Sequence, residues 1–276
     1  MLLSVIILEG IEKNPQGEEM KTIIYENGLR AQSCEKKIKE SRLASRYEEV
    51  IILPIPSTRD GVTVNGCSVT LDEALADASE STLVIGYSIP GNVRSRACSL
   101  GAAVCDSELD EGFTRGNAEL TALAALGIIL NTEQRAPADL SVGIIGYGRI
   151  GSQLTRLLLF LGTRVRVYTR KESVMLGLAE CGVSSMKSDD AADLSDIDVL
   201  VNTAPARIFD RALCASEDMR INDLASGDNF PCAARVEKYP SLPARTFPVT
   251  AGRLWAESVE RFLLLGGSFE GESDDE

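Results

Sequence analysis

Residues Ser141–Arg170 read SVGIIGYGRIGSQLTRLLLFLGTRVRVYTR, and this stretch decides the fold of the second half of the chain. It opens with a short apolar run, Val142–Ile145, which is typical of a buried parallel strand. Leucines then recur at helical spacing as far as Gly162, and a second apolar run begins at Val165. The stretch therefore predicts one strand–helix–strand unit.

Three glycines form the pattern G-x-G-x-x-G at the first turn of this unit. The first allows a tight turn out of the strand, the second lets a pyrophosphate approach the backbone, and the third lets the helix pack close to the sheet. The helix N-terminus adds unpaired N–H groups and a partial positive charge. In this context the pattern predicts a Rossmann domain that binds a dinucleotide. The alternative is a glycine turn in a Rossmann domain that no longer binds a ligand. The residues predicted to contact the cofactor here are Gly146, Tyr147, Gly148, Arg149, Ile150 and Gly151.

The end of the second strand, Thr169-Arg170-Lys171, determines which cofactor we expect. An NAD site usually places Asp or Glu at this position, where the carboxylate binds the ribose 2′-OH. A carboxylate is absent here and two cations are adjacent, so a 2′-phosphate is attracted rather than repelled. The sequence therefore favours NADP over NAD. A solvated strand end without a ligand is the alternative interpretation of the two cations.

Two further strand ends carry polar residues. One follows the apolar run Ile197–Val201, and the other ends the run Met219–Leu224. The nicotinamide half of a dinucleotide passes the ends of such strands in a Rossmann domain. We therefore predict cofactor contacts from Asn202, Thr203, Ala204, Pro205, Asp223, Leu224 and Ala225.

The composition excludes several classes of function. The chain has 276 residues, of which 44% are hydrophobic, so it can form two domains with proper cores. Its formal net charge is −13, and nucleic acid is not an expected partner because phosphate backbones are bound by basic patches. No apolar run approaches the roughly 18 residues that span a membrane. The seven cysteines are odd in number and irregularly spaced, which predicts reduced thiols in the cytoplasm rather than disulfides or zinc ligands.

The chain contains no histidine. This absence excludes a His base, a His metal ligand and a Ser–His pair, and we expect no metal site. It also excludes the His acid/base of the D-2-hydroxyacid dehydrogenases, whose nucleotide loop this one resembles. A carboxylate or a water molecule is then the expected proton acceptor.

Strand-like and helix-like segments alternate along the first part of the chain, which predicts a parallel sheet. We expect an α/β fold of two Rossmann-like domains with parallel sheets, the second a doubly wound NAD(P)-binding domain. Residues 1–112 with the C-terminal helix 249–266 would form the substrate domain, residues 113–248 the NAD(P)-binding domain, and residues 267–276 a disordered acidic tail. The predicted strands of the first domain are Leu2–Leu8, Lys21–Tyr25, Val50–Leu53, Leu83–Gly86 and Ala102–Cys105. The predicted helices include Asn117–Leu130, Arg207–Ala215 and Gly252–Leu265.

Six blocks of the sequence, taken in order from Glu49 to Leu265, resemble the first of the two subunits of dipicolinate synthase. This sporulation enzyme makes pyridine-2,6-dicarboxylate from an intermediate of the lysine pathway. The order and spacing of the blocks together carry the resemblance. The blocks are Ile51-Ile52-Leu53-Pro54, Asn117-Ala118-Glu119 with Thr121, Gly146–Gly151, Asn202–Pro205, Asp223–Ser226 and Pro248–Gly252.

The resemblance implies an oxidation that forms a pyridine ring, with 4-hydroxy-tetrahydrodipicolinate as the substrate and a nicotinamide as the hydride acceptor. Glu119 is then the candidate base, because we expect it at the start of a helix where burial would raise its pKa. A helix-start Glu stabilised by the macrodipole is the alternative. A dicarboxylate also needs cations and hydrogen-bond donors. The candidates for substrate binding are Ser57, Thr58, Arg59 and Thr250, each of which is alternatively a loop or capping residue.

The resemblance further implies a flavoprotein-like second subunit of the enzyme, and it makes a homo-oligomer the expected assembly. Three departures from the family lie near the expected substrate site. The glycine-rich turn after the first strand is replaced by Glu9-Gly10 and a polar stretch, the motif G-L-P-G is Ser241–Ala244, and the glycine after Glu119 is Leu120. Two alternatives therefore stay open: another NAD(P)-dependent oxidoreductase with a different small substrate, and a nucleotide-binding regulatory protein without catalysis.

Overall fold

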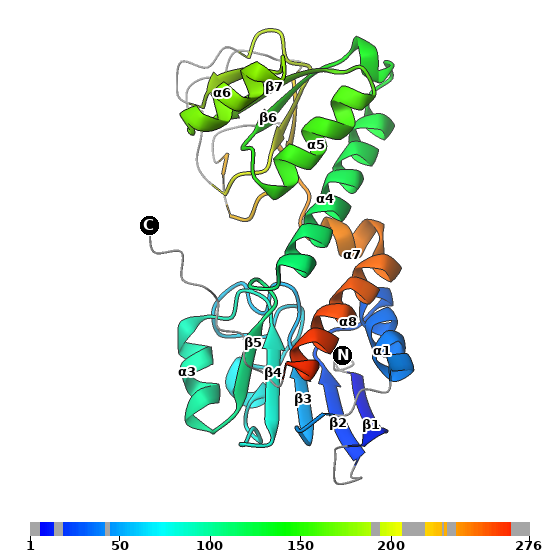
Figure 1. Ribbon diagram of the computed structural model, residues 1–276, viewed down its shortest axis with the longest axis vertical. Helices are drawn as coiled ribbons and strands as arrows, with labels where there is room; N and C mark the ends of the chain where they lie inside the picture. Colours follow the sequence, from blue (N-terminus) through cyan, green and yellow to red (C-terminus); the bar gives the residue numbers. More distant parts are fainter. Residues whose placement is uncertain are drawn as a thin grey trace. The chain divides into compact units, whose positions relative to one another are not determined.

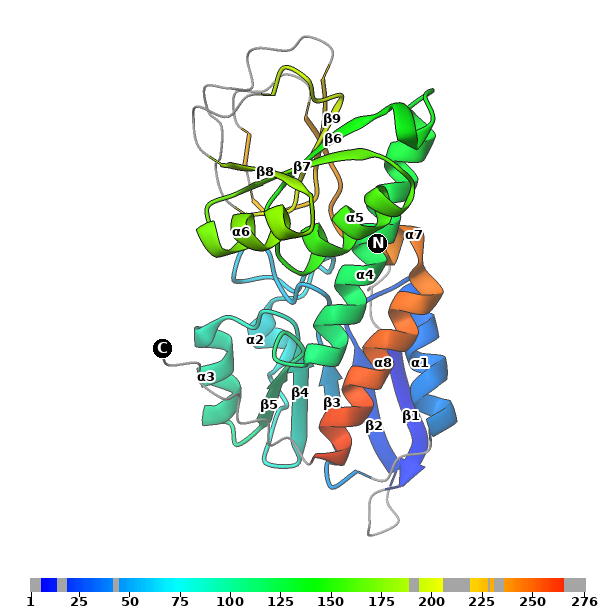
Figure 2. The ribbon, with the colours of Figure 1, turned by 45° about the horizontal axis from the view of Figure 1, so that its top comes forward.

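The computed structural model describes residues 6–13, 19–41, 45–188, 194–205, 219–227, 229–230 and 236–265. The chain forms two compact α/β units, each with its own sheet (Figure 1 and Figure 2). Unit 1 comprises Met1–Asn117 and Phe247–Glu276, and unit 2 comprises Ala118–Thr246. The predicted acidic tail, residues 267–276, and the predicted helix Arg207–Ala215 lie outside the described residues.

The sheet of unit 1 has five strands in the order β1-β2-β3-β4-β5. The last four strands are parallel, as predicted, but β1 is antiparallel to β2, so the expectation of a wholly parallel sheet is wrong at this edge. The segment between Lys13 and Glu19 is far shorter than the crossover of a dozen or more residues that a parallel pair needs. The predicted strand Leu2–Leu8 overlaps β1 only from residue 6, and its first residues lie outside the described ranges. The strands are β1 (Ile6–Lys13), β2 (Glu19–Ile24), β3 (Glu49–Ile52), β4 (Thr82–Gly86) and β5 (Ala103–Asp106).

Helices cover both faces of this sheet (Figure 1 and Figure 2). On one face lie α1 (Leu29–Ser41) and α8 (Pro248–Leu264), and on the other lie α2 (Leu71–Ala74) and α3 (Gly91–Ser99). The sheet is therefore buried on both sides, which explains why its central strands are continuous apolar runs.

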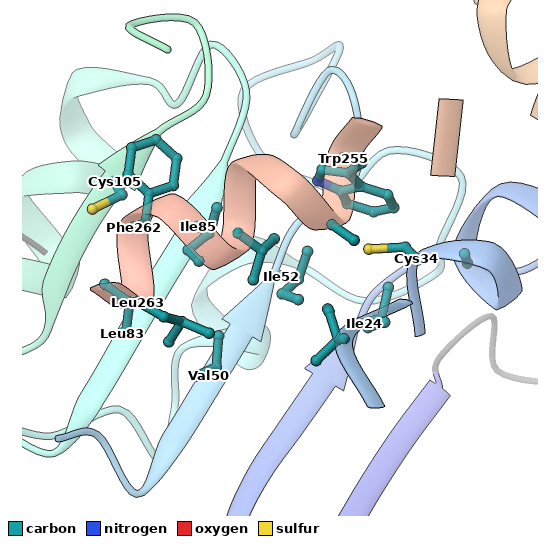
Figure 3. Packing of buried hydrophobic residues seen from close by; sticks show 14 of the residues in the cluster. Ile24, Cys34, Val50, Ile52, Leu83, Ile85, Cys105, Trp255, Phe262 and Leu263 are labelled. Carbon is teal, nitrogen blue, oxygen red and sulfur yellow. The ribbon is translucent and has the colours of Figure 1, made fainter. Parts of the chain in front are cut away.

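The last helix of the chain completes the core of unit 1. Trp255 and Phe262 of α8 are fully buried against Ile52 and Ile85 of the central strands, as Figure 3 shows. Gly252 lets α8 approach α1 closely, because a Cβ at this position would overlap the carbonyl oxygen of Arg30. The two segments that form unit 1, although far apart in sequence, thus share one hydrophobic core.

The sheet of unit 2 has six strands, all parallel, in the order β11-β10-β9-β6-β7-β8. Counted from its own first strand, β6, this is the Rossmann order 3-2-1-4-5-6, with the switch point between β6 and β9. The predicted fold class is confirmed by this sheet. The strands are β6 (Ser141–Ile145), β7 (Arg164–Thr169), β8 (Ser184–Lys187), β9 (Val199–Asn202), β10 (Arg220–Asp223) and β11 (Val236–Lys238).

Three helices pack on one face of this sheet in a single apolar cluster. They are α4 (Glu111–Thr132), α5 (Arg149–Phe160) and α6 (Glu172–Glu180), and a short 3-10 turn, Pro137–Asp139, connects α4 to β6. The helix predicted from Asn117 begins earlier, at Glu111, because Asp110 caps it: Asp110 Oδ1 accepts the N–H of Phe113 at 3.1 Å.

Two elements of the structure had no sequence prediction. The edge strand β11 has only three residues, two of them charged, and α7 (Leu242–Thr246) has five. Both are too short to show a hydrophobic period. Among the helices that the structure describes, none is long and apolar enough to cross a bilayer.

Candidate nucleotide site and the predicted substrate residues

The glycine turn after β6 has the geometry that the sequence predicts. Gly146 has φ +88°, a conformation that L side chains rarely adopt, so the chain can turn sharply out of the strand. A Cβ on Gly151 would overlap the carbonyl oxygen of Gly146, so the helix packs against the turn at a distance that only glycine permits. Gly148, in contrast, faces open space, with no atom near its Cβ position. The turn is therefore closed toward the protein and open on its outer side.

The N-terminus of α5 begins directly at this open side. Gly148 is the N-cap residue, and no side chain caps the helix. The first N–H groups of a 12-residue helix are thus available to an anion, and its macrodipole favours negative charge there. Arg149 is exposed at the first helical position, whereas Tyr147 and Ile150 are half-buried. These features fit the pyrophosphate of a dinucleotide.

Thr203 holds the glycine turn from the neighbouring strand. Its backbone N–H and its hydroxyl both donate to the carbonyl oxygen of Ile145, at 3.0 and 2.9 Å. The same hydroxyl lies 3.1 Å from the Cβ position of Gly146 and 3.0 Å from that of Gly151. The predicted cofactor residue Thr203 is therefore placed behind the turn, where it fixes the backbone that would face the phosphates.

A buried network joins the ends of β9 and β10. Asn202 Nδ2 donates to Asp223 Oδ1 at 2.8 Å, while Asn202 Oδ1 accepts the N–H of Ala204 at 3.1 Å. Asp223 also accepts the N–H of Ala225 at 3.2 Å and the side-chain amide of Asn229 at 3.2 Å. Asn202, Asp223 and Asn229 are all almost fully buried, so these bonds are shielded from water.

This network brings together two of the predicted strand ends and adds one residue that the sequence did not single out. Asn229 lies beyond β10, and its role follows only from the fold of the chain back onto Asp223. Leu224 and Ala225 are half-buried, and Pro205 is exposed. The network links the strand ends at the carboxyl edge of the sheet, where α/β proteins bind ligands.

The end of β7 has no carboxylate. Thr169 is buried, and its hydroxyl accepts the N–H of Lys171 at 3.2 Å, which shapes the turn into α6. Arg170 and Lys171 are both exposed. The structure thus presents two cations beside a small hydroxyl residue at the position that selects between the two cofactors.

The predicted substrate residues of unit 1 have different surroundings. The hydroxyl of Ser57 is fully buried, donates to the carbonyl oxygen of Tyr87 at 3.0 Å and accepts the N–H of Tyr87 at 2.9 Å. It therefore joins the ends of β3 and β4, and its donor is already used within the protein. Arg59 is exposed, and its Nε donates to Asn65 Oδ1 at 3.1 Å.

Thr58 belongs to a loop that Asp60 organises. Asp60 accepts hydrogen bonds from the hydroxyls of Thr58 and Thr63 and from the N–H groups of Val62 and Thr63. These donors hold the pKa of the Asp60 carboxyl well below its usual range, the hydroxyl of Thr63 being the largest cause. The loop that carries Thr58 and Arg59 is thus ordered by a carboxylate that stays ionised.

Two of the predicted positions differ from expectation. Glu119 lies more than two turns inside α4 and is exposed, so both its expected place at a helix start and its expected burial are wrong. The reason is the earlier cap at Asp110. Thr250 is exposed in the first turn of α8, which begins at Pro248 rather than at Gly252. The roles of Glu119 and Thr250 stay predictions.

The described residues include no group of three or more Cys, Asp or Glu side chains placed to hold a metal ion. All five cysteines that the structure places are free thiols. Cys214 and Cys232 lie outside the described ranges.

A comparison with protein-family models matches residues 128–219 to the NAD-binding domain of the D-isomer specific 2-hydroxyacid dehydrogenases. The matched region contains the glycine turn, the end of β7 and the end of β9. A comparison with curated protein sequences found no significant match.

Solved structures with a similar fold include the first subunit of dipicolinate synthase from two bacilli. The Bacillus subtilis protein has a TM-score of 0.73 at 19% identity, covering 94% of this chain and 97% of its own. The Bacillus halodurans protein has a TM-score of 0.72 at 20% identity, covering 86% of this chain and 94% of its own. A D-isomer specific 2-hydroxyacid dehydrogenase from Lactobacillus delbrueckii, solved with NAD, has a TM-score of 0.52 at 10% identity. The match covers 90% of this chain and 98% of the dehydrogenase. The chain therefore has the fold of the first dipicolinate synthase subunit, and its unit 2 contains a domain that matches the NAD-binding domain of the D-2-hydroxyacid dehydrogenases.

Proposed function

We propose that this protein is an NADP-dependent oxidoreductase that oxidises 4-hydroxy-tetrahydrodipicolinate to dipicolinate, as its resemblance to the first subunit of dipicolinate synthase implies. The observation that carries the dinucleotide part is the glycine turn, closed by Gly151 on the inside and open at Gly148 beside an uncapped helix N-terminus. The fold shared with the two bacillus proteins supports the reaction type. The net chemistry is the loss of one water, one hydride and one proton from the substrate.

The residues of unit 2 bind and orient the dinucleotide in this proposal. The N–H groups at the start of α5 bind the pyrophosphate, and Thr203 and the Asn202–Asp223 pair hold the surrounding strand ends in place. Arg170 and Lys171 attract the 2′-phosphate. When bound, the nicotinamide supplies the hydride acceptor, and aromatisation of the substrate supplies driving force.

Proton removal is assigned to Glu119. It is a carboxylate, and the chain has no histidine to take this role. Its exposure leaves it accessible to a substrate or to water. Among the substrate candidates, Thr58, Arg59 and Thr250 are assigned to the carboxylates of the substrate, whereas the buried Ser57 positions the loop that carries the first two.

We also propose that the protein works in the cytoplasm as a homo-oligomer together with a flavoprotein-like second subunit. The five cysteines that the structure describes are free thiols, which supports the compartment. The likeness to a protein that is itself one subunit of an enzyme supports the partner. A flavoprotein gene adjacent to this one would support the same assignment.

Incubation with 4-hydroxy-tetrahydrodipicolinate and NADP tests the reaction, with dipicolinate absorbance and NADPH formation as the readouts. We expect both products from the wild type and a loss of at least tenfold in turnover for Glu119→Gln, because general base catalysis contributes about 10²–10⁴-fold. Rapid turnover by the Gln variant would remove Glu119 as the base. Binding of nucleotide without any reaction would favour the regulatory alternative.

A further inference from the structure

The ends of β7 and β8 lie side by side. Thr169, the last residue of β7, and Lys187, the last residue of β8, are direct partners in the parallel register. The N–H of Ser188 also donates to the carbonyl oxygen of Thr169 at 3.1 Å. Because side chains of paired residues in a parallel sheet project to the same face, the side chain of Lys187 leaves the sheet on the face of Thr169.

Lys187 adds a third cation to the two that follow Thr169. Arg170, Lys171 and Lys187 are all exposed, and none of them forms an ion pair with another residue that the structure describes. In a chain with a net charge of −13, three such cations at one edge of a sheet need an explanation. The carboxylates nearest to them in sequence are Glu172, the exposed first residue of α6, and Asp189 and Asp190, which follow Lys187 and lie outside the described residues.

We infer that Lys187 is a specificity-determining residue that binds the 2′-phosphate of NADP together with Arg170 and Lys171. This inference rests on the proposed use of NADP. A phosphate monoester carries close to two negative charges and three acceptor oxygens, so it is best bound by cations that approach from more than one side. Arg170 and Lys171 come from the turn after β7, and Lys187 comes from the adjacent strand.

Direct binding measurements separate the 2′-phosphate from the rest of the nucleotide. The probes are adenosine 2′,5′-bisphosphate against 5′-AMP, and NADP against NAD, titrated by calorimetry into the full-length protein. For Lys187→Ala we expect about tenfold weaker binding of the two probes that carry the 2′-phosphate, the loss expected for one charge-assisted contact. Binding of 5′-AMP and NAD should change by less than about twofold.

Arg164 provides a matched control on the same pair of strands. It is the exposed first residue of β7, and an extended strand places it about 17 Å from Thr169. Arg164→Ala removes the same charge and should leave all four affinities unchanged. Lys187→Arg should retain the preference for the 2′-phosphate because it retains the charge.

The outcomes distinguish this inference from the proposed function. If the wild type binds NADP no more tightly than NAD, the proposed cofactor is wrong and the inference fails with it. If the wild type prefers NADP and Arg170→Ala abolishes this preference but Lys187→Ala does not, only the inference is overturned. An equal loss of affinity for all four probes in Lys187→Ala would also overturn it, because the effect would not depend on the 2′-phosphate.

Discussion

At the scale of single residues, Thr203 links the glycine turn to the end of β9 through its backbone N–H and its hydroxyl. We expect Thr203→Val to weaken binding of NADP and NAD by the same factor, because the valine cannot donate to the carbonyl oxygen of Ile145. The full contribution of such a hydrogen bond, about 1 kcal/mol, sets an upper limit of roughly fivefold on this loss of affinity. The measurement is the Kd of each cofactor by calorimetry.

The matched control is Thr203→Ser, which keeps the hydroxyl and should restore most of the affinity. Unequal effects on NADP and NAD in Thr203→Val would contradict the positioning role. Thr203 acts on the turn that both cofactors share, whereas Lys187 is assigned to a phosphate that only one of them carries.

At the scale of secondary-structure elements, the contact between α1 and α8 depends on a glycine. We expect Gly252→Ala to lower the free energy of unfolding by about 1–3 kcal/mol, because the added methyl overlaps the carbonyl oxygen of Arg30 in a packed interface. Gly177 in α6 is the matched control, since nothing lies near its Cβ position. Gly177→Ala should stabilise α6 by about 0.5–1 kcal/mol. Denaturant unfolding measures the free energy of unfolding of both variants. Equal changes in Gly252→Ala and Gly177→Ala would contradict the close contact between α8 and α1.

Part of the site could be predicted from the sequence, and part depends on how the elements pair. Gly146, Gly148 and Gly151 act through their own backbone, so the shape of the turn could be predicted from their spacing, and the structure confirms this geometry. Lys187 lies beside Thr169 because of the register between β7 and β8, and Asn229 reaches Asp223 because the chain turns back after β10. Neither arrangement can be predicted from a local sequence pattern. Glu119 was misplaced because the capping side chain of Asp110 lies before the stretch that looked helical. The antiparallel β1 was missed because pairing direction depends on the length of a connection.

At the scale of the whole molecule, four of the five cysteines that the structure describes fall into two classes, and Cys67 is half-buried. Cys98 and Cys181 are exposed, whereas Cys34 and Cys105 are buried. Burial raises the pKa of the Cys34 thiol, and it raises that of Cys105 to about 11. We expect iodoacetamide to alkylate Cys98 and Cys181 in the native protein and the other two only on unfolding. Peptide mapping by mass spectrometry gives the order in which the cysteines are alkylated. Early labelling of Cys105 would contradict its burial.

The raised pKa of Cys105 also predicts a pH dependence of stability. The folded state favours the protonated thiol, so the contribution of Cys105 to stability is complete below its ordinary pKa of 9.0 and is lost as the pH rises to about 11. We expect the free energy of unfolding to fall over this interval in denaturant titrations. A Cys105→Ala variant should show a smaller fall over the same interval, and an identical fall would assign the effect to other groups.

The closure of unit 1 by α8 has a consequence for how the protein is made. The ribosome releases the strands of unit 1 first, then all of unit 2, and only afterwards the helix that carries Trp255 and Phe262. Unit 2 has a continuous sequence and can fold during synthesis, as domains generally do. The nascent first sheet must wait with part of one apolar face, the part that α8 covers beside α1, exposed until translation passes Leu264. During that interval this face is the surface that a chaperone would recognise.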